Sequence, residues 1–414
     1  MPLVSDGDTS KTLRLDPFRA VTYTRTDKLA ELTCPPYDVI GAGAVETFEA
    51  ADAHNIVHLI LPRPGPHEDR YTHAARELRS WLAGGVLTRD PVPALYVYEH
   101  ENARATALGL VGAVGLTSPV LPHEDTFPGP VADRTALMDA TRAQLEPILL
   151  TYEGGGAASD VVDSVVDTPP FLSTRIDDAT HRVWRIADPE RLAAVAADLA
   201  TRRALIADGH HRFAAYRRVM AAGSRPDAES SGLAMLVDAT RHPLDLRGVH
   251  RSVRDLAFDD AIAAAQTAFQ VRHVTSLDEA MRAQARAADH RATFVVGDGS
   301  RYAVLHDPAG QVLEATLPPE HSPAWRSLDA AVLRHTVLGS LWKVDDAGDR
   351  VRHHHDAEAA ITAAVDDAGV AVLVRSPRLR DVLGLAAAGE RMPQKSTSFG
   401  PKPRMGLLMR LLEG

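Results

Sequence analysis

The sequence predicts a mixed α/β or α+β fold with more than one compact domain. Its 414 residues exceed the length that one hydrophobic core usually organises. Short apolar runs typical of strands alternate irregularly with helical segments, which favours a mixed architecture over a regular doubly wound sheet. Past about residue 255 the segments become alanine-rich. We therefore expect a catalytic α/β domain over residues 13–255, an additional α+β module over 256–360 and a C-terminal segment, 361–414, that returns to the core.

Hydrophobic periodicity predicts the elements of the first half. Residues 70–82 have apolar side chains at helical spacing and end before two glycines. Runs rich in Val, Leu and Tyr at 94–99 and 106–116 are expected to pair as strands. The polar, proline-bearing segment 118–133 predicts a loop, which is expected to lead into a helix over 134–145 and a strand over 148–152.

Local signals continue into the second half. Residues 181–186 alternate as a half-buried strand does, and Asp188-Pro189 predicts the N-cap and first position of a helix that runs to residue 201. A short buried strand is expected at 204–207, directly before a helix. Further expected elements are helices over 259–270 and 276–289, a hairpin over 294–306, a strand over 370–374 and a helix over 379–388.

Composition and charge exclude several classes of protein. The formal net charge is -10, so the chain lacks the basic excess that drives non-specific binding of nucleic acid, and we do not expect nucleic acid as a main partner. The single cysteine, Cys34, excludes an intramolecular disulfide and any multi-cysteine metal site. The N-terminus lacks a signal-peptide pattern, and no apolar run approaches about 20 residues, so a cytoplasmic protein without membrane spans is expected.

The segment Asp208-Gly209-His210-His211-Arg212 is predicted to be the centre of the site. It joins a short strand to a helix, whose first N–H groups lack intrahelical partners and attract anions. Gly209 would let an anion approach the backbone, and Arg212 could hold phosphate oxygens through paired hydrogen bonds. The histidines add donors, and Asp208 could cap the helix, orient a histidine or hold Mg²⁺ through water. In a purely structural interpretation, Asp208 only caps the helix, the His210 side chain packs against neighbouring residues, and the His211 side chain is solvated.

Two further groups of residues are candidates. Glu124, in the proline-stiffened segment 121–130, is the candidate general base. In the alternative interpretation, this segment is a solvated surface loop and Glu124 has no catalytic role. Asp133, Arg134 and Arg142 are expected to support the site rather than contact a ligand. In the tail, Lys395, Ser396 and Lys402 lie between prolines and could contact polyphosphate. The predicted set is therefore catalytic Glu124, Asp208 and His210, with phosphate- or nucleotide-binding Gly209, His211, Arg212, Lys395 and Ser396.

Standard catalytic motifs are absent from the sequence. There is no G-x-x-x-x-G-K-[ST] loop, no G-x-G-x-x-G after a first strand, no G-x-S-x-G elbow and no H-E-x-x-H pair. If the protein handles phosphate, it must use another scaffold.

Seven segments together resemble a bacterial and archaeal family, domain of unknown function 1015. They follow the family's order across nearly the whole chain. These segments are Cys34-Pro35-Pro36-Tyr37-Asp38-Val39-Ile40, Asn55-Ile56-Val57, Tyr96-Val97-Tyr98-Glu99, Leu121-Pro122-His123-Glu124 with Thr126, Thr141-Arg142-Ala143 with Leu145, Pro147 and Ile148, Ala207-Asp208-Gly209-His210-His211-Arg212, and Met392-Pro393-Gln394-Lys395-Ser396-Thr397.

A second resemblance indicates a chemical function. The strand, D-G-H-x-R turn and helix are similar to those of the ParB and sulfiredoxin-like superfamily, which includes kinases of free serine. In those kinases the turn binds phosphate, and a glutamate elsewhere deprotonates the substrate hydroxyl. The resemblance implies these roles for Asp208, Gly209, His210 and Arg212. His211 stands where the kinases have threonine, and the glutamate is assigned to Glu124 without an alignment.

Three functions are compatible with these predictions. The leading one is a kinase that transfers phosphate from ATP or ADP, with Mg²⁺, to the hydroxyl of a free amino acid such as L-serine. The second is a metal-dependent hydrolase in which Asp208, His210 and His211, with His123 or Glu124, bind Zn²⁺ or Mn²⁺. The third is a nucleotide-hydrolysing switch akin to ParB proteins, although the acidic charge and the lack of an evident helix-turn-helix argue against DNA.

Overall fold

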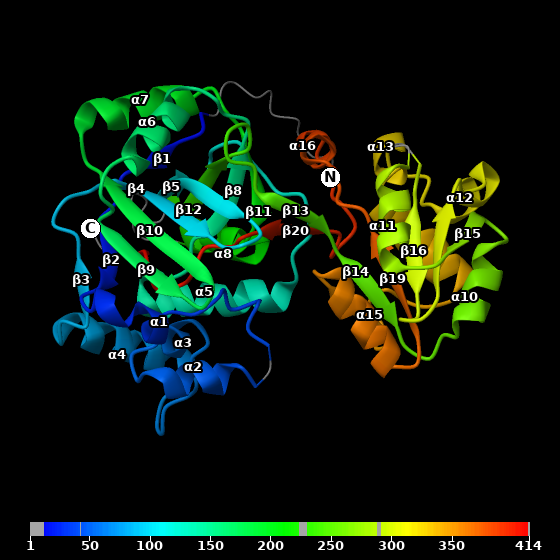
Figure 1. Ribbon diagram of the computed structural model, residues 1–414. Helices are drawn as coiled ribbons and strands as arrows, with labels where there is room; N and C mark the ends of the chain where they lie inside the picture. Colours follow the sequence, from blue (N-terminus) through cyan, green and yellow to red (C-terminus); the bar gives the residue numbers. More distant parts are fainter. Residues whose placement is uncertain (1–11, 42, 223–229, 288–290, 413–414) are drawn as a thin grey trace. The chain divides into compact units, whose positions relative to one another are not determined.

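The computed structural model describes residues 12–41, 43–222, 230–287 and 291–412. The chain divides into two compact units (Figure 1): unit 1 comprises Met1–Asp245 and Gly400–Gly414, and unit 2 comprises Leu246–Phe399. The expected mixed α/β class is confirmed. The boundaries expected at 255 and 360 differ from this division, because the strand over 370–374 pairs inside the sheet of unit 2.

Unit 1 is built on a nine-stranded mixed sheet in the order β6-β11-β8-β12-β5-β4-β10-β9, with β1 paired to β5. The predicted pair of strands is confirmed, because β4 and β5 pair antiparallel with Tyr96 opposite Val111. The strands are β1 (Leu15–Asp16), β4 (Leu95–Glu101), β5 (Thr106–Gly115), β6 (Val120–Leu121), β8 (Ile148–Tyr152), β9 (Leu172–Ile176), β10 (Ala179–Ile186), β11 (Ala204–Asp208) and β12 (Ser231–Asp238).

Capping residues fix several helices of unit 1. Asp69 accepts hydrogen bonds from the backbone N–H groups of Tyr71 and Thr72 and so begins α4 (Arg70–Ala83). Asp188 caps α7 (Pro189–Leu199), as the consecutive residues Asp188 and Pro189 predict. The remaining elements are η1 (Thr26–Lys28), α1 (Leu29–Leu32), α2 (Val45–Ala51), α3 (Val57–Ile60), α6 (Ala157–Val166) and α8 (His210–Ala222), with a small sheet of β3 (Leu87–Arg89), β2 (Ala20–Tyr23), β21 (Met409–Leu411) and β7 (Ala143–Gln144).

One helix begins earlier than predicted. The helix expected over 134–145 is α5 (Pro128–Thr141), so the last part of the predicted loop is helical. Its two prolines occupy the first turn, where a missing N–H costs no intrahelical hydrogen bond. The helix ends where Arg142 takes a left-handed conformation.

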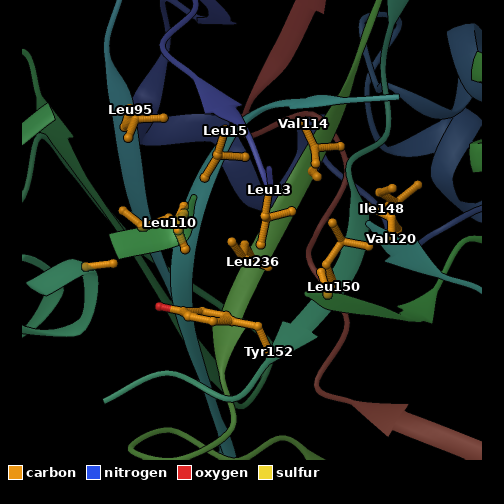
Figure 2. Packing of buried hydrophobic residues seen from close by; sticks show 14 of the residues in the cluster. Leu13, Leu15, Leu95, Leu110, Val114, Val120, Ile148, Leu150, Tyr152 and Leu236 are labelled. Atoms are coloured by element: carbon orange, nitrogen blue, oxygen red, sulfur yellow. The ribbon is translucent and has the colours of Figure 1, made fainter. Parts of the chain in front are cut away.

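The main hydrophobic core of unit 1 lies against the nine-stranded sheet. Alternate residues of β8, namely Ile148, Leu150 and Tyr152, belong to it together with side chains from β4, β5 and β12 (Figure 2). Helix α8 contributes Phe213 and Tyr216 to the same cluster. The start of α8 is therefore held by a buried scaffold.

Unit 2 is an α+β unit with a six-stranded sheet in the order β15-β17-β16-β19-β14-β18. The predicted hairpin is confirmed as β16 and β17. The helix predicted over 276–289 is α11, and its predicted end at residue 289 lies outside the described residues. Its elements are β14 (His250–Val253), α10 (Phe258–Ala265), β15 (Gln270–Val274), α11 (Leu277–Ala285), β16 (Phe294–Gly297), β17 (Tyr302–His306), α12 (Gly310–Thr316), α13 (Pro323–Arg326), α14 (Asp329–Ala331), the π-helix η2 (Val332–Leu341), β18 (Val351–His354), α15 (Ala357–Asp366), β19 (Val370–Val374) and α16 (Leu379–Ala387).

Two strands carry the chain across the boundary between the units. They are β13 (Asp245–Gly248) and β20 (Thr397–Gly400), which pair with each other. Among the helices in the described part of the chain, none is long and apolar enough to cross a membrane.

Candidate functional site

The predicted strand, turn and helix junction is present in unit 1. Strand β11 ends at Asp208, Gly209 forms the turn, and α8 begins at His210. Gly209 has a φ of +95°, and a Cβ atom there would lie 2.8 Å from Cγ2 of Ile148. Backbone conformation and packing both require glycine at this position. The roles of the residues in ligand binding remain predictions.

A group of charged side chains, of which Arg212 is buried, surrounds Asp208. One carboxylate oxygen accepts a hydrogen bond from Nη2 of Arg212 at 2.5 Å, and the other forms an ion pair with Nζ of Lys402. The Lys402 ammonium also lies 3.5 Å from a carboxylate oxygen of Asp38. The C-terminal segment thus brings a lysine to the turn from almost 200 residues away in the sequence.

The charges of this group support one another. Burial opposes ionisation of Asp208, but Lys402 and Arg212 outweigh it and hold the pKa of this carboxyl below its ordinary value. Burial also disfavours the charged form of Lys402, yet Asp208 and Asp38 raise the pKa of its ammonium. The pKa of Arg212 is raised against burial by Asp208 and Glu146. All three side chains therefore stay charged at neutral pH.

Both histidines of the turn hold the loop that carries Glu124. The backbone N–H of His123 donates to Nε2 of His210 at 3.3 Å, and that of Phe127 donates to Nε2 of His211 at 3.0 Å. The rings of His123 and His210 also make an edge-on contact, with centroids 4.6 Å apart. Glu124, which is half-buried, lies between the two anchored residues. His210 is buried and packs, as the purely structural interpretation expects, whereas His211 is half-buried rather than solvated.

Arg212 is more deeply buried than a direct phosphate clamp would be. Its side chain is 3% exposed, and Nη1 donates to the carbonyl oxygen of Pro147 at 2.7 Å. Nε is buried and has no hydrogen-bond partner among the described residues. The guanidinium therefore orients Asp208, and its Nε is the donor still available toward a ligand.

Arg134, which is expected to support the site, forms a second ion pair that is buried. Its Nη1 lies 3.2 Å from Oε2 of Glu146, and its guanidinium stacks over the Tyr37 ring at 4.4 Å. The backbone N–H of Tyr37 donates to Oε1 of the same glutamate at 3.3 Å. Asp133 also pairs with Arg134, whereas Arg142 ends α5.

Three residues near the turn were not predicted as site residues. Tyr37, Asp38 and Glu146 lie in two of the segments that resemble the family, but nothing in their local pattern indicates an approach to Arg212 or Lys402. Their positions depend on contacts between segments separated by about 70 residues or more. The resemblance could have identified Tyr37 and Asp38, but Glu146 stands at a position that the resemblance leaves unspecified.

The two tail residues predicted to contact phosphate belong to unit 2. Lys395 is exposed and Ser396 is buried. The predicted grouping of these residues with the turn of unit 1 therefore remains a prediction, and Lys402 is the tail residue that contacts the turn.

Comparisons with known proteins identify the family. The model of a family described as "Protein of unknown function (DUF1015)" matches residues 15–331, which is more than half of the chain. The chain belongs to this family. The resemblance expected from the seven segments is confirmed, and no curated protein matches the chain.

Several solved structures are distantly similar to the chain. SbnI with a C-terminal truncation from Staphylococcus aureus shares 12% identity with a TM-score of 0.38, covering 73% of this chain and 87% of that one. A free serine kinase mutant in complex with ADP shares 12% identity with a TM-score of 0.37, covering 70% and 87%. A conserved hypothetical protein from Pyrococcus furiosus shares 14% identity with a TM-score of 0.35, covering 70% and 90%. At these values the ParB/sulfiredoxin-like core and the activity remain predictions.

Proposed function

We propose that the protein is a phosphotransferase that moves a phosphoryl group from ATP or ADP to the hydroxyl of a small molecule, with a free amino acid such as L-serine as the leading acceptor. The observation that carries the proposal is the junction of the Glu124 loop with the turn. His210 and His211 hold this loop against the start of α8, where unsatisfied N–H groups favour phosphate. The candidate base and the candidate anion site therefore belong to one hydrogen-bonded unit.

Lys402 supplies the positive charge that the proposal needs. Its side chain is 24% exposed, whereas that of Arg212 is 3% exposed. Asp208 holds the Lys402 ammonium on one oxygen and the Arg212 guanidinium on the other. In the proposed site, Lys402 contacts the phosphate and Arg212 fixes the position of Asp208.

The proposed reaction uses these groups for positioning and charge stabilisation. Glu124 accepts the proton of the acceptor hydroxyl while its oxygen forms a bond to the terminal phosphorus of the nucleotide. The bond from that phosphorus to the bridging oxygen breaks, so ATP leaves as ADP, or ADP leaves as AMP. Lys402 and the N–H groups at the start of α8 stabilise the negative charge on the transferred group.

The predicted binding of magnesium by Asp208 does not fit this arrangement. Both carboxylate oxygens already face cations, so the proposed reaction contains no step through a metal on this residue. The hydrolase alternative also gains no support, because Nε2 of His210 and of His211 accepts a backbone hydrogen bond. In the described ranges, no group of three His, Cys, Asp or Glu side chains is placed to hold a metal ion.

A transfer assay tests the proposal. The protein is incubated with ATP, ADP or CTP, Mg²⁺ and a pool of hydroxylated amino acids, and new phosphorylated species are followed by mass spectrometry. We expect one phosphorylated amino acid to accumulate in step with nucleotide loss. Nucleotide loss without a phosphorylated acceptor would favour the ParB-like switch instead.

Glu124→Gln separates chemistry from binding. We expect the transfer rate to fall by about 100-fold or more, because the general base is lost, while nucleotide affinity stays within about twofold. Glu190→Gln, on the exposed first turn of α7, is the matched control and should transfer at the wild-type rate. Full transfer by Glu124→Gln would remove Glu124 from the mechanism.

A further inference from the structure

Unit 2 contains an open cavity of its own, with a volume of about 400 Å³. This volume lies in the range of pockets that hold small organic ligands. The cavity lies between the α13–α14 region, the end of β19, the start of α16 and the segment before β20. Its apolar wall includes Leu328, Val374, Leu385 and Met392.

A buried hydroxyl in this cavity lacks a partner. Ser396 lines the cavity and is 3% exposed, and its Oγ has no hydrogen-bond partner within the described ranges. Leaving a buried hydroxyl unsatisfied is costly, so its presence calls for a missing partner. A ligand oxygen in the cavity would supply that partner.

The N-terminus of α16 forms another part of the wall. Arg378 is its N-cap residue, and the Arg378 side chain makes no capping hydrogen bond. The helix is nine residues long, and its unsatisfied N–H groups with the helix dipole favour an anion at this end.

The charges of the wall favour an anion as well. Arg375 and Asp329 form a two-bonded ion pair, with distances of 2.7 and 2.9 Å, and neutralise each other. Arg380 faces its neighbour Asp381 at 3.7 Å. Together with Arg378, the lining therefore contains three arginines and two aspartates.

The walls are held in place without a ligand. Glu390 accepts hydrogen bonds from the backbone N–H of Ser322 and from Nδ1 of His321, both at 2.9 Å. The indole N–H of Trp325 donates to the carbonyl oxygen of Arg391 at 2.7 Å. These bonds tie the segment before Met392 to α13, so the cavity does not need to be assembled on binding.

We propose that this cavity binds the oxyanion group of a small metabolite, with the oxyanion at Ser396, Arg378 and the start of α16 and the organic part against the apolar wall. A phosphomonoester and a carboxylate share this chemistry. The proposal concerns unit 2 alone and does not depend on phosphoryl transfer in unit 1.

The methyl group of Met392 reports on the cavity directly. We would label the methionine methyl groups of the full chain with ¹³C, assign Met392 through Met392→Leu, and titrate with inorganic phosphate, glycerol phosphate or succinate. We expect a saturable shift of the Met392 signal, tighter for glycerol phosphate than for phosphate because its organic part fills the cavity. Saturation by succinate instead would identify the carboxylate as the ligand group.

Two variants decide whether the binding uses the proposed groups. Ser396→Ala removes a hydroxyl that bonds to no described residue, so the fold should be kept and affinity should fall about fivefold. Arg378→Gln should weaken binding about tenfold or more. Arg282→Gln, at an exposed position of α11, is the control and should bind as the wild type. The proposal would be overturned if none of the three probes gave a saturable shift of the Met392 signal. It would also be overturned if both variants bound the probe with the affinity of the wild type.

Discussion

At the scale of single residues, Asp208 is the group on which the site depends. Its carboxylate lies between two cations, the half-buried Lys402 and the buried Arg212. Breaking a buried ion pair by removing one partner leaves an uncompensated charge, which is more costly than losing the attraction alone. The residue has a structural role whatever ligand the site takes.

Asp208→Asn should therefore lower the free energy of unfolding by about 3–5 kcal/mol at neutral pH. The pKa of Asp208 is lowered in the folded state, so its contribution is fully present above the unfolded pKa of about 3.9 and is lost as the pH falls through the folded value. Urea unfolding of wild type and variant should thus converge in acid. A difference that persists or grows there would contradict this account. Asp27→Asn, at an exposed ion pair, should change little.

At the scale of elements, the turn between β11 and α8 combines two constraints on one glycine. The positive φ of Gly209 disfavours any side chain, and the neighbouring Ile148 leaves no room for one. Gly43 has nearly the same φ, +92°, but its surroundings are open within 4 Å. A comparison of substitutions at the two glycines therefore separates the cost of backbone strain from the cost of packing.

Gly43→Ala should cost about 1 kcal/mol of unfolding free energy, the lower end of the range for a strained backbone. Gly209→Ala should cost about 1–3 kcal/mol more, because the added Cβ also displaces Ile148. Thermal and urea unfolding measure both values. Equal costs for the two variants would show that packing around the turn relaxes freely.

Elements with local signals were predictable, and contacts between distant segments were not. The cap Asp188 and the strand, turn and helix at 204–212 follow from neighbouring residues. The start of α5 was misjudged because Pro128 and Pro130 also suit a loop. The loop around Glu124 and the tail lysine Lys402 were singled out by composition, but nothing local shows that both reach the turn between β11 and α8.

At the scale of the whole molecule, the chain is organised as two units with separate cores. The second domain was predicted from a change in composition, but the sequence could not show that β19 joins the six-stranded sheet, because an apolar run fits either sheet. In unit 2, Arg251 and Asp346 form a buried, two-bonded ion pair at 2.7 and 3.1 Å, with 3% and 5% of the side chains exposed. This pair allows the stability of unit 2 to be changed selectively.

Asp346→Asn leaves the Arg251 charge buried and should destabilise unit 2 by about 3–5 kcal/mol. Burial opposes ionisation of Asp346, but His353 and Arg251 hold the pKa of its carboxyl well below the ordinary value, so this loss should be present throughout the neutral range. Amide hydrogen exchange followed by mass spectrometry should show faster exchange in β14 and β19 and unchanged exchange in β5 and β12. Asp345→Asn, at the exposed neighbouring position, is the control. Equal loss of protection in both sheets would mean that the two units unfold as one.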